Sequence, residues 1–519
     1  MSGDGSGSQL IKNSLLTLAN SFFMMISSWV ISIWVARQLG PDNYGIFCLV
    51  LWLTGTVSQV IGMGFIHAIT RFIAEYKGKG EFTSLTPIIR FVLGIEVTIS
   101  LFSTALLIFF KTKIADYFFS PNESFYIFIA ALGLLPGMVT AIFSATIEGI
   151  QKFEYFTYSN LIISPLSFAA KVIVLLMGKG VAGILYVMLI FSFINSLFYF
   201  IVLKREGFFK SGSWTMLSPG IKRRIHEYNK SVIAILLCDK IVWDKSENFF
   251  LGRLCSSQEV GFYNLGYNVA QRFMSILPST LWRVLFPAMS SYFGSGNKRK
   301  MRRLFFLSTR YLAFVTFPIG IGGMILAYQI IHYLYGHEFI GAQRVLQIIF
   351  VSSIVSTLSN PASAVLYGFD KQAFIYKFGA ILAVLNITLD ILFIKHFGAT
   401  GAAVCYGVTT VIGSTGGLIY TCTTMRLRYP IVSIFKIAFA TIVMGIVMEV
   451  IILQNGAIPG FIIATLAGGM VYLISALVLG TFEKEDYALL QSAKKVCPGS
   501  VKNIIDLICS MIAQFKSGR

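Results

Sequence analysis

Residues 13–49 read "NSLLTLANSFFMMISSWVISIWVARQLGPDNYGIFCL", and they contain no charged side chain before Arg37. The apolar part is long enough to cross the hydrocarbon core of a bilayer, roughly 30 Å, as one helix. Similar runs recur to the end of the 519-residue chain, which is 56% hydrophobic and 13% charged. We therefore predict an all-α integral membrane protein, because a β-barrel would show short alternating strands instead.

The apolar runs predict about 14 transmembrane helices. They lie near residues 10–35, 44–66, 86–110, 123–148, 154–178, 181–203, 231–252, 259–286, 304–330, 339–366, 372–394, 398–422, 432–453 and 457–480. Lys and Arg concentrate in alternate loops, such as 71–79, 204–224 and 298–303. This bias predicts a multi-pass protein of the cell (inner or plasma) membrane with both termini in the cytoplasm. The net charge of +19 comes from these Lys and Arg residues in the cytoplasmic loops, which face anionic lipid headgroups. We therefore expect no nucleic acid as a partner.

A second stretch, residues 229–265, repeats the first and reads "NKSVIAILLCDKIVWDKSENFFLGRLCSSQEVGFYNL". Five pairs share an offset of 216 residues: Asn13 with Asn229, Arg37 with Arg253, Gly45 with Gly261, Phe47 with Tyr263, and Leu49 with Leu265. Each half holds an even number of spans, so both halves enter the membrane in the same direction. This pattern predicts two pseudo-symmetric lobes that rock against each other, with the substrate between them near the midplane.

The predicted domains follow from this repeat. They are an N-terminal six-helix lobe (1–203), a cytoplasmic linker loop (204–230), a C-terminal six-helix lobe (231–422), two additional transmembrane helices (432–480), and a cytoplasmic tail with an amphipathic helix (481–519). The tail is included because its apolar residues recur at helical spacing, which is typical of a helix that lies in the membrane interface.

The seventh predicted span contains the charged segment "CDKIVWDKSENFF", residues 238–250. Lys240, Asp244 and Glu247 fall within about 60° of one another on a helix, Asp239 flanks that face, and Lys245 points elsewhere. A charge that faces lipid at mid-membrane costs at least about 2.5–3.5 kcal/mol, so this face is expected to line a hydrated cavity. We assign the two lysines to substrate binding and the three acids to ion coupling or to the cavity. In the alternative interpretation, Lys240 and Asp244 only neutralise each other across one turn.

Arg272 and Arg283 lie in the eighth predicted span, three helical turns apart, and roughly share a face. Two guanidinium groups on one face suit a phosphate or pyrophosphate group, although structural partners would explain them as well. Arg90, Glu96, Lys171, Asp390 and Glu449 are further ionisable residues within predicted spans. The seven cysteines and five histidines show no metal-ligand spacing, so we predict no disulfide framework, metal site, cofactor or catalytic residue.

The segment "WVARQLGPDNYGIFCLVLWLTGTVSQVIGMGFIHAITRFIAEYKGKGE", residues 34–81, resembles the opening of the polysaccharide transporter family. The shared motif residues include Arg37, Gly40, Pro41, Tyr44, Gly45 and Arg71. The family belongs to the multidrug, oligosaccharidyl-lipid and polysaccharide exporter superfamily. The resemblance implies a flippase that moves an oligosaccharide on a polyprenyl pyrophosphate, such as an O-antigen unit, from the cytoplasmic to the outer leaflet. It also implies Na⁺ or H⁺ as candidate coupling ions, and membrane lipids and a polysaccharide polymerase machinery as partners.

Three alternatives compete with this interpretation. A multidrug exporter of the same superfamily typically has a carboxylate in its first span, and residues 10–35 contain none. A membrane enzyme needs a concentrated acid–base or metal site, often in a large outer loop, whereas the predicted outer loops are short. A purely structural membrane protein has little reason for buried charge. Whether Asp244 and Glu247 bind a coupling cation or tune the lysines stays open at this point.

Overall fold

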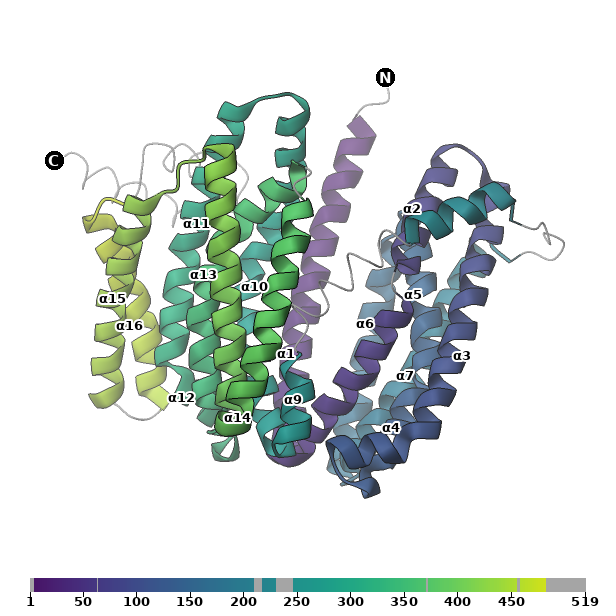
Figure 1. Ribbon diagram of the computed structural model, residues 1–519, viewed down its shortest axis with the longest axis horizontal. Helices are drawn as coiled ribbons and strands as arrows, with labels where there is room; N and C mark the ends of the chain where they lie inside the picture. The colour runs from purple at the N-terminus through teal and green to yellow at the C-terminus, as the bar shows by residue number, and fades with distance from the viewer. Residues whose placement is uncertain are drawn as a thin grey trace. The chain divides into compact units, whose positions relative to one another are not determined.

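The computed structural model describes residues 4–62, 64–209, 217–229, 246–369, 372–454 and 458–481, and within these ranges the regular structure is entirely helical (Figure 1). The helices of the first half are α1 (Asp4–Gly62), α2 (Phe65–Gly78), α3 (Leu85–Phe118), α4 (Ser124–Leu132), α5 (Leu134–Gly149), α6 (Glu154–Leu176), α7 (Gly180–Arg205) and α9 (Glu247–Leu254). Those of the second half are α10 (Ser257–Gly294), α11 (Lys298–Ile325), α12 (Ala327–Ile330), α13 (Ala342–Gly368), α14 (Gln372–Met425), α15 (Ile431–Gln454) and α16 (Ile458–Val478). Short helical turns are η1 (Phe82–Ser84), η2 (Pro121–Glu123), η3 (Ile331–Tyr335) and η4 (His337–Phe339).

Ten helical segments among the described residues are long and apolar enough to cross a membrane. The predicted all-α membrane fold is thereby confirmed, whereas the number 14 stays a prediction. Two of the ten segments contain a sharp bend at a glycine: α1 at Gly40, with φ 70°, and α14 at Gly398, with φ 53°. Only glycine adopts such angles without a steric penalty, so each glycine allows one continuous helical run to change direction.

The predicted span at 123–148 consists of two helices, α4 and α5, that meet at Gly133. Pro136 is the third residue of α5, where its missing N–H group leaves no hydrogen bond unmade. Hydropathy does not reveal this break because glycine and proline interrupt the run without lowering its apolar character. The predicted spans at 432–453 and 457–480 correspond to α15 and α16, each of which is apolar enough to cross a membrane.

The chain divides into two compact units that differ from the predicted lobes in their limits. Unit 1 comprises Met1–Asn264 together with Asp390–Ala399, and unit 2 comprises Leu265–Leu389 and Thr400–Arg519. Helices α10 and α14 therefore each contribute to both units. The predicted domain boundaries stay predictions.

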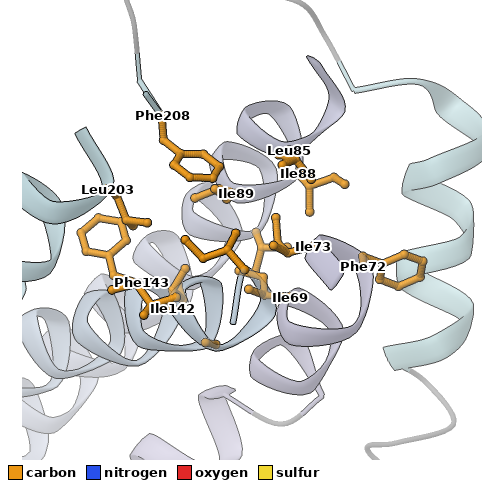
Figure 2. Packing of buried hydrophobic residues seen from close by; sticks show 14 of the residues in the cluster. Ile69, Phe72, Ile73, Leu85, Ile88, Ile89, Ile142, Phe143, Leu203 and Phe208 are labelled. Carbon is orange, nitrogen blue, oxygen red and sulfur yellow. The ribbon is translucent and has the colours of Figure 1, made fainter. Parts of the chain in front are cut away.

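The main core of unit 1 is formed by α2, α3, α5 and the end of α7 (Figure 2). On α2, Ile69, Phe72, Ile73 and Tyr76 recur at helical spacing and are all buried, so one face of this amphipathic helix packs inward. Ile69 and Ile73 lie near Ile88 of α3 and Ile142 of α5, as Figure 2 shows, whereas Phe72 packs against the ring of Tyr228. This core holds α2 firmly against the membrane-spanning helices of the unit.

Two glycines that the repeat pairs, Gly45 and Gly261, lie against each other in unit 1. A Cβ atom at Gly45 would stand 1.7 Å from the backbone oxygen of Ser257, and one at Gly261 would stand 2.4 Å from that of Pro41. No side chain fits at either position, so the two helices are in backbone contact. Two positions that the predicted repeat makes equivalent are therefore in contact.

In unit 2, α11 packs against α13, α15 and α16, and α15 and α16 pack against each other (Figure 1). The hydroxyl of Tyr472 on α16 donates a hydrogen bond to the Phe314 carbonyl of α11 at 2.6 Å. Gly468 of α16 lies so close to Met448 of α15 that a Cβ atom would approach its Cγ to 2.5 Å. The last two helices are thus tightly packed parts of unit 2.

Candidate functional site

A buried polar cluster lies at the start of α9. We define it as Ser246, Glu247, Asn248, Asn264 and Asp390, which α9, α10 and α14 contribute to unit 1. Glu247 is 2% exposed and Asp390 is 0% exposed. The Ser246 hydroxyl donates to Asp390 Oδ2 at 3.4 Å, and Asn264 Nδ2 donates to Asn248 Oδ1 at 2.7 Å. Oxygen atoms from three helices are thereby gathered in one buried place.

Carboxylate, hydroxyl and amide oxygens are the donors that hard cations prefer in proteins. A buried ionised carboxylate costs several kcal/mol unless it is paired and hydrogen-bonded. The cluster thus places two buried carboxyl groups beside hydroxyl and amide groups in a membrane-spanning unit. These polar neighbours are suited to orient the carboxyl groups.

Of the charged residues predicted in the seventh span, Glu247 falls in the described part of the chain and belongs to the cluster. Asp239, Lys240, Asp244 and Lys245 lie outside the described residues, so the shared charged face stays a prediction. Sequence reasoning singled out Glu247 and Asp390 because they are charged. It missed the neutral members Ser246, Asn248 and Asn264, whose only indication is their amide or hydroxyl group within an apolar context.

Arg272 lies on α10 and is half-buried, and its Nη1 atom is buried without a hydrogen-bond partner among the described residues. Next to it along the helix, Gln271 donates to the Tyr406 hydroxyl at 2.8 Å. Arg283 lies on the same helix, but its side chain is outside the described part. Pro278 stands between the two arginines, so α10 is not regular there and their shared face stays a prediction.

The motif residues Arg37, Gly40, Pro41, Tyr44 and Gly45 surround the bend of α1. Gly40 adopts the left-handed angle, Tyr44 is buried, and Gly45 makes the backbone contact with α10. Arg37 is exposed. In the described structure these residues shape and pack the helix, which gives the motif a structural reason that its sequence pattern did not reveal.

Arg71, the remaining motif residue, belongs to a contact between α2 and a helix over residues 219–229, which we call the linker helix (Figure 1, the teal helix beside α2). The Arg71 guanidinium lies 4.6 Å from the ring centre of Tyr228. Arg224 donates to both carboxylate oxygens of Glu75, at 3.0 and 3.1 Å, and to the Tyr76 hydroxyl at 3.2 Å. The segment predicted as a loop therefore contains a helix that docks on the first half of the chain.

Charge pairing holds this contact together. Hydrogen bonds from Lys79 and from Arg224 lower the pKa of Glu75 below its ordinary value of 4.5, and the Glu75 carboxylate raises the pKa of Arg224. The helix begins at Ser218, whose hydroxyl accepts a hydrogen bond from the Ile221 N–H at 3.4 Å. The Ser218–Pro219 pair is a typical helix start that the sequence reasoning missed because it weighed polarity alone.

Three further ionisable residues are buried within helices. Glu96 of α3 is 0% exposed, and neither of its carboxyl oxygens has a hydrogen-bond partner in the described structure. Lys171 of α6 is partly buried. Arg310 of α11 is also buried, and its guanidinium lies 5.3 Å from the Tyr311 ring centre. Sequence reasoning named the first two and missed Arg310, although an arginine inside an apolar run is the same kind of evidence.

The fold and the charged interior define the class: an all-α, multi-pass membrane protein with ionisable groups buried among its helices. The chain belongs to the polysaccharide biosynthesis protein family, whose model matches residues 34–344. This confirms the resemblance predicted from residues 34–81.

Among its relatives is a putative O-antigen transporter of Shigella flexneri, 20% identical over 78% of this chain and 95% of that protein. A probable flippase, AglR, of Haloferax volcanii is 22% identical over 74% of this chain and 78% of that protein. A membrane protein of the cps region of Klebsiella pneumoniae is 24% identical, but that match spans only 32% of this chain and 33% of the relative.

Two solved structures show the same fold. The inward closed conformation of the lipid II flippase MurJ covers 90% of this chain and 98% of its own, with a TM-score of 0.69 and 17% identity. The inward-facing conformation of a multidrug resistance MATE family transporter of the MOP superfamily covers 77% of this chain and 94% of its own, with a TM-score of 0.64 and 14% identity.

Proposed function

We propose that the protein is a flippase that moves a lipid-linked oligosaccharide, carried on a polyprenyl pyrophosphate, from the cytoplasmic to the outer leaflet of the cell membrane. The transport serves the biosynthesis of a surface polysaccharide, and a polysaccharide polymerase machinery would receive the product. The observation that carries the proposal is the alignment with the O-antigen transporter over 95% of its length. The protein acts as a transporter, not as an enzyme, and both of its termini lie in the cytoplasm.

Recognition of the pyrophosphate falls to basic side chains. We assign this role to Lys240, Lys245, Arg272 and Arg283, since guanidinium and ammonium groups bind phosphate oxygens well in a water-poor site. The buried Nη1 atom of Arg272, which has no partner among the described residues, supports the assignment because it leaves a donor available for an anionic ligand. The polyprenyl chain stays in the lipid while the headgroup crosses.

Coupling to an ion gradient falls to the acids. We assign Asp239, Asp244 and Glu247, together with Asp390, to the binding of Na⁺ or H⁺. The buried polar cluster supports this role for Glu247 and Asp390, whose oxygens are hard donors in an apolar surrounding. Binding of the cation would bias the protein toward one state of an alternating-access cycle, because a ligand shifts an equilibrium by its differential affinity for the two states.

The test uses a strain from which the gene is deleted. Its lipid-linked sugars are analysed by mass spectrometry after treatment of intact cells with an external glycosidase. A flippase predicts that an intact oligosaccharide-lipid accumulates and is protected from the enzyme. Reintroducing the wild-type gene should restore cleavage, and a pool that is unchanged by the deletion would contradict the proposal.

A second candidate function is export of small cationic compounds, which the fold shared with the MATE transporter favours. Against it, the first span carries no acidic residue between residues 13 and 36. The same deletion strain separates the two functions. Loss of resistance to small toxic cations, with an unchanged lipid-linked sugar pool, is the result expected of an exporter.

A further inference from the structure

Unit 2 contains a cavity of about 790 Å³ that is separate from the buried polar cluster of unit 1. Its walls come from the end of α11 with α12, from α13, from the part of α14 that follows the Gly398 bend, and from α15. A cavity of this size accommodates a drug-sized molecule or a lipid headgroup with the first part of its chains. The walls differ in polarity along the length of the helices.

One end of the cavity is polar. Tyr328 and Gln329 lie on the short α12, and Gln343 and Gln347 lie in the first turns of α13. The Oε1 atom of Gln329 is buried and has no hydrogen-bond partner within the described ranges. Gln347 uses its Nε2 atom to donate to the Met324 carbonyl at 3.3 Å, which fixes the orientation of its amide. The polar end therefore carries several amide groups and one tyrosine hydroxyl.

The charge of the cavity is negative. Glu449 of α15 lines it, and the described lining residues include no lysine or arginine. Glu449 is exposed and lies five residues before the end of α15, that is, about 7.5 Å along the helix. A carboxylate beside amide oxygens attracts a cation that can also donate hydrogen bonds, and it disfavours an anion.

The other end of the cavity is apolar. Ile348 and Val351 of α13 and Val408 and Ile412 of α14 form this wall. Val408 is 39% exposed, and the α14 residues of this wall run from Val404 to Ile412, about 12 Å along the helix. Both helices are candidate membrane spans, so this wall lies within the membrane-spanning part of unit 2. An amphiphile with a polar head and an apolar tail matches this arrangement.

We propose that this cavity binds a phospholipid with a primary ammonium headgroup, of the phosphatidylethanolamine kind, whose ammonium contacts Glu449 and the glutamine oxygens. Its acyl chain lies along the wall formed by Val351 and Val408. The site is distinct from that of the transported substrate, because the pyrophosphate of the proposed function has a net negative charge, whereas the phosphate of the ethanolamine lipid is balanced by its own ammonium group. The proposal therefore stands or falls independently of the flippase function.

The experiment is native mass spectrometry of the purified full-length protein, delipidated in detergent and titrated with palmitoyl-oleoyl phosphatidylethanolamine or phosphatidylglycerol. We expect one ethanolamine lipid to bind more tightly than the glycerol lipid. Glu449→Gln, which keeps the shape and removes the charge, should weaken ethanolamine-lipid binding about tenfold. The matched control is Glu338→Gln, which removes an exposed carboxylate of η4 that does not line the cavity.

A second variant tests the site without altering its charge. Val408→Phe places a larger side chain in the cavity and should reduce the binding of the ethanolamine lipid while the thermal unfolding temperature stays close to that of the wild type. Equal binding of the two lipids by the wild-type protein would overturn the proposal. So would ethanolamine-lipid affinities that are the same in Glu449→Gln, Val408→Phe and the wild type.

Discussion

Glu247 and Asp390 are far apart in the chain and both are buried, and Ser246, the neighbour of Glu247, donates a hydrogen bond to Asp390. Buried acids of this kind do not serve stability well, because the cost of removing a charge from water is rarely recovered in full. Their presence in an apolar interior is consistent with the proposed role in cation coupling. Substitution of each carboxylate by its carboxamide tests that role separately from stability.

The first prediction concerns these acids. Glu247→Gln and Asp390→Asn remove a carboxylate with little change of shape. Each should reduce ion-dependent transport about tenfold or more, the loss typical when a coordinating or orienting group is removed. The thermal unfolding temperature should not fall, because each variant removes one buried carboxylate and keeps the shape of its side chain. The readout is oligosaccharide-lipid translocation as a function of Na⁺ and pH.

Asp116→Asn serves as the matched control, since Asp116 is an exposed acid at the end of α3 in the same unit. Its transport should equal that of the wild type. Full, ion-dependent transport in both Glu247→Gln and Asp390→Asn would rule out the assignment of these residues to coupling.

The second prediction concerns the backbone contact at Gly45. Gly45→Ala forces a methyl group against the Ser257 carbonyl, so the helices must separate. Overpacking of this kind costs roughly 1–3 kcal/mol. Gly55→Ala, on the same helix α1, meets no atom within 4 Å and should be neutral or slightly stabilising. Thermal unfolding in detergent compares the two variants, and equal unfolding temperatures would show that the contact is not tight.

At the scale of elements, the linker helix does not only connect two parts of the chain but also packs against α2. Arg224 and Tyr228 fasten it to Glu75 and Arg71 of α2, and α2 is itself anchored in the core of unit 1 (Figure 2). The linker helix, at the end of the first half of the chain, is therefore bound to unit 1. Force transmitted through the linker would reach α2 and the core behind it.

The third prediction follows from the lowered pKa of Glu75. A carboxylate whose pKa is lower in the folded state contributes stability above its unfolded value, 4.5, and loses this contribution as the pH falls through the folded value. Hydrogen-exchange protection of residues 219–229 should therefore decrease as the pH is lowered below about 4.5. The effect is small, within about 1 kcal/mol, because the pair is partly exposed.

Glu75→Gln should show weaker protection of residues 219–229 at neutral pH and a smaller change on acidification. Glu227→Gln is the comparison variant, since Glu227 pairs with Arg223 on the exposed side of the same helix at 2.8 Å. It should leave the docking of the helix intact. If both variants exchange like the wild type at every pH, the pairing with Arg224 does not hold the linker helix.

At the scale of the whole molecule, sequence reasoning predicted the helical membrane fold and the family because long apolar runs and a continuous motif are local properties. It separated the spans at 10–35 and 44–66 and those at 372–394 and 398–422, in agreement with the bends at Gly40 and Gly398. It could not predict the angles of the bends, since a glycine's φ angle depends on tertiary packing. It also treated residues 204–230 as a loop, because a polar helix that packs through a few residues such as Ile225 leaves little hydropathy signal.

The candidate site was predictable to a similar extent. Charged residues within spans are conspicuous in the sequence, so Glu247 and Asp390 could be predicted as site candidates. Their proximity could not be predicted, because it depends on how α9 and α14 pack. Neutral polar residues such as Asn264 are not conspicuous in an apolar sequence in the way that charged residues are. The charged face of the seventh span rests on residues outside the described part, and it remains to be tested by mutation.

The fourth prediction concerns orientation. The distribution of Lys and Arg places η4 outside the cell and the end of α10 in the cytoplasm. In a cysteine-free background, His337→Cys should react with a membrane-impermeant maleimide in whole cells. Ser295→Cys, the matched exposed position at the other end of the unit, should react only after permeabilisation. The opposite pattern of labelling would invert the topology and with it the direction of transport.

The contact between Gly45 and Gly261 has an evolutionary consequence. Equivalent positions of two parallel repeats meet in the same way as one residue meets its own copy across the two-fold axis of a homodimer. Under the predicted repeat, a single ancestral glycine would have formed both sides of this contact. In the present chain the two glycines are separate positions, and each must stay small for the other to allow the close approach.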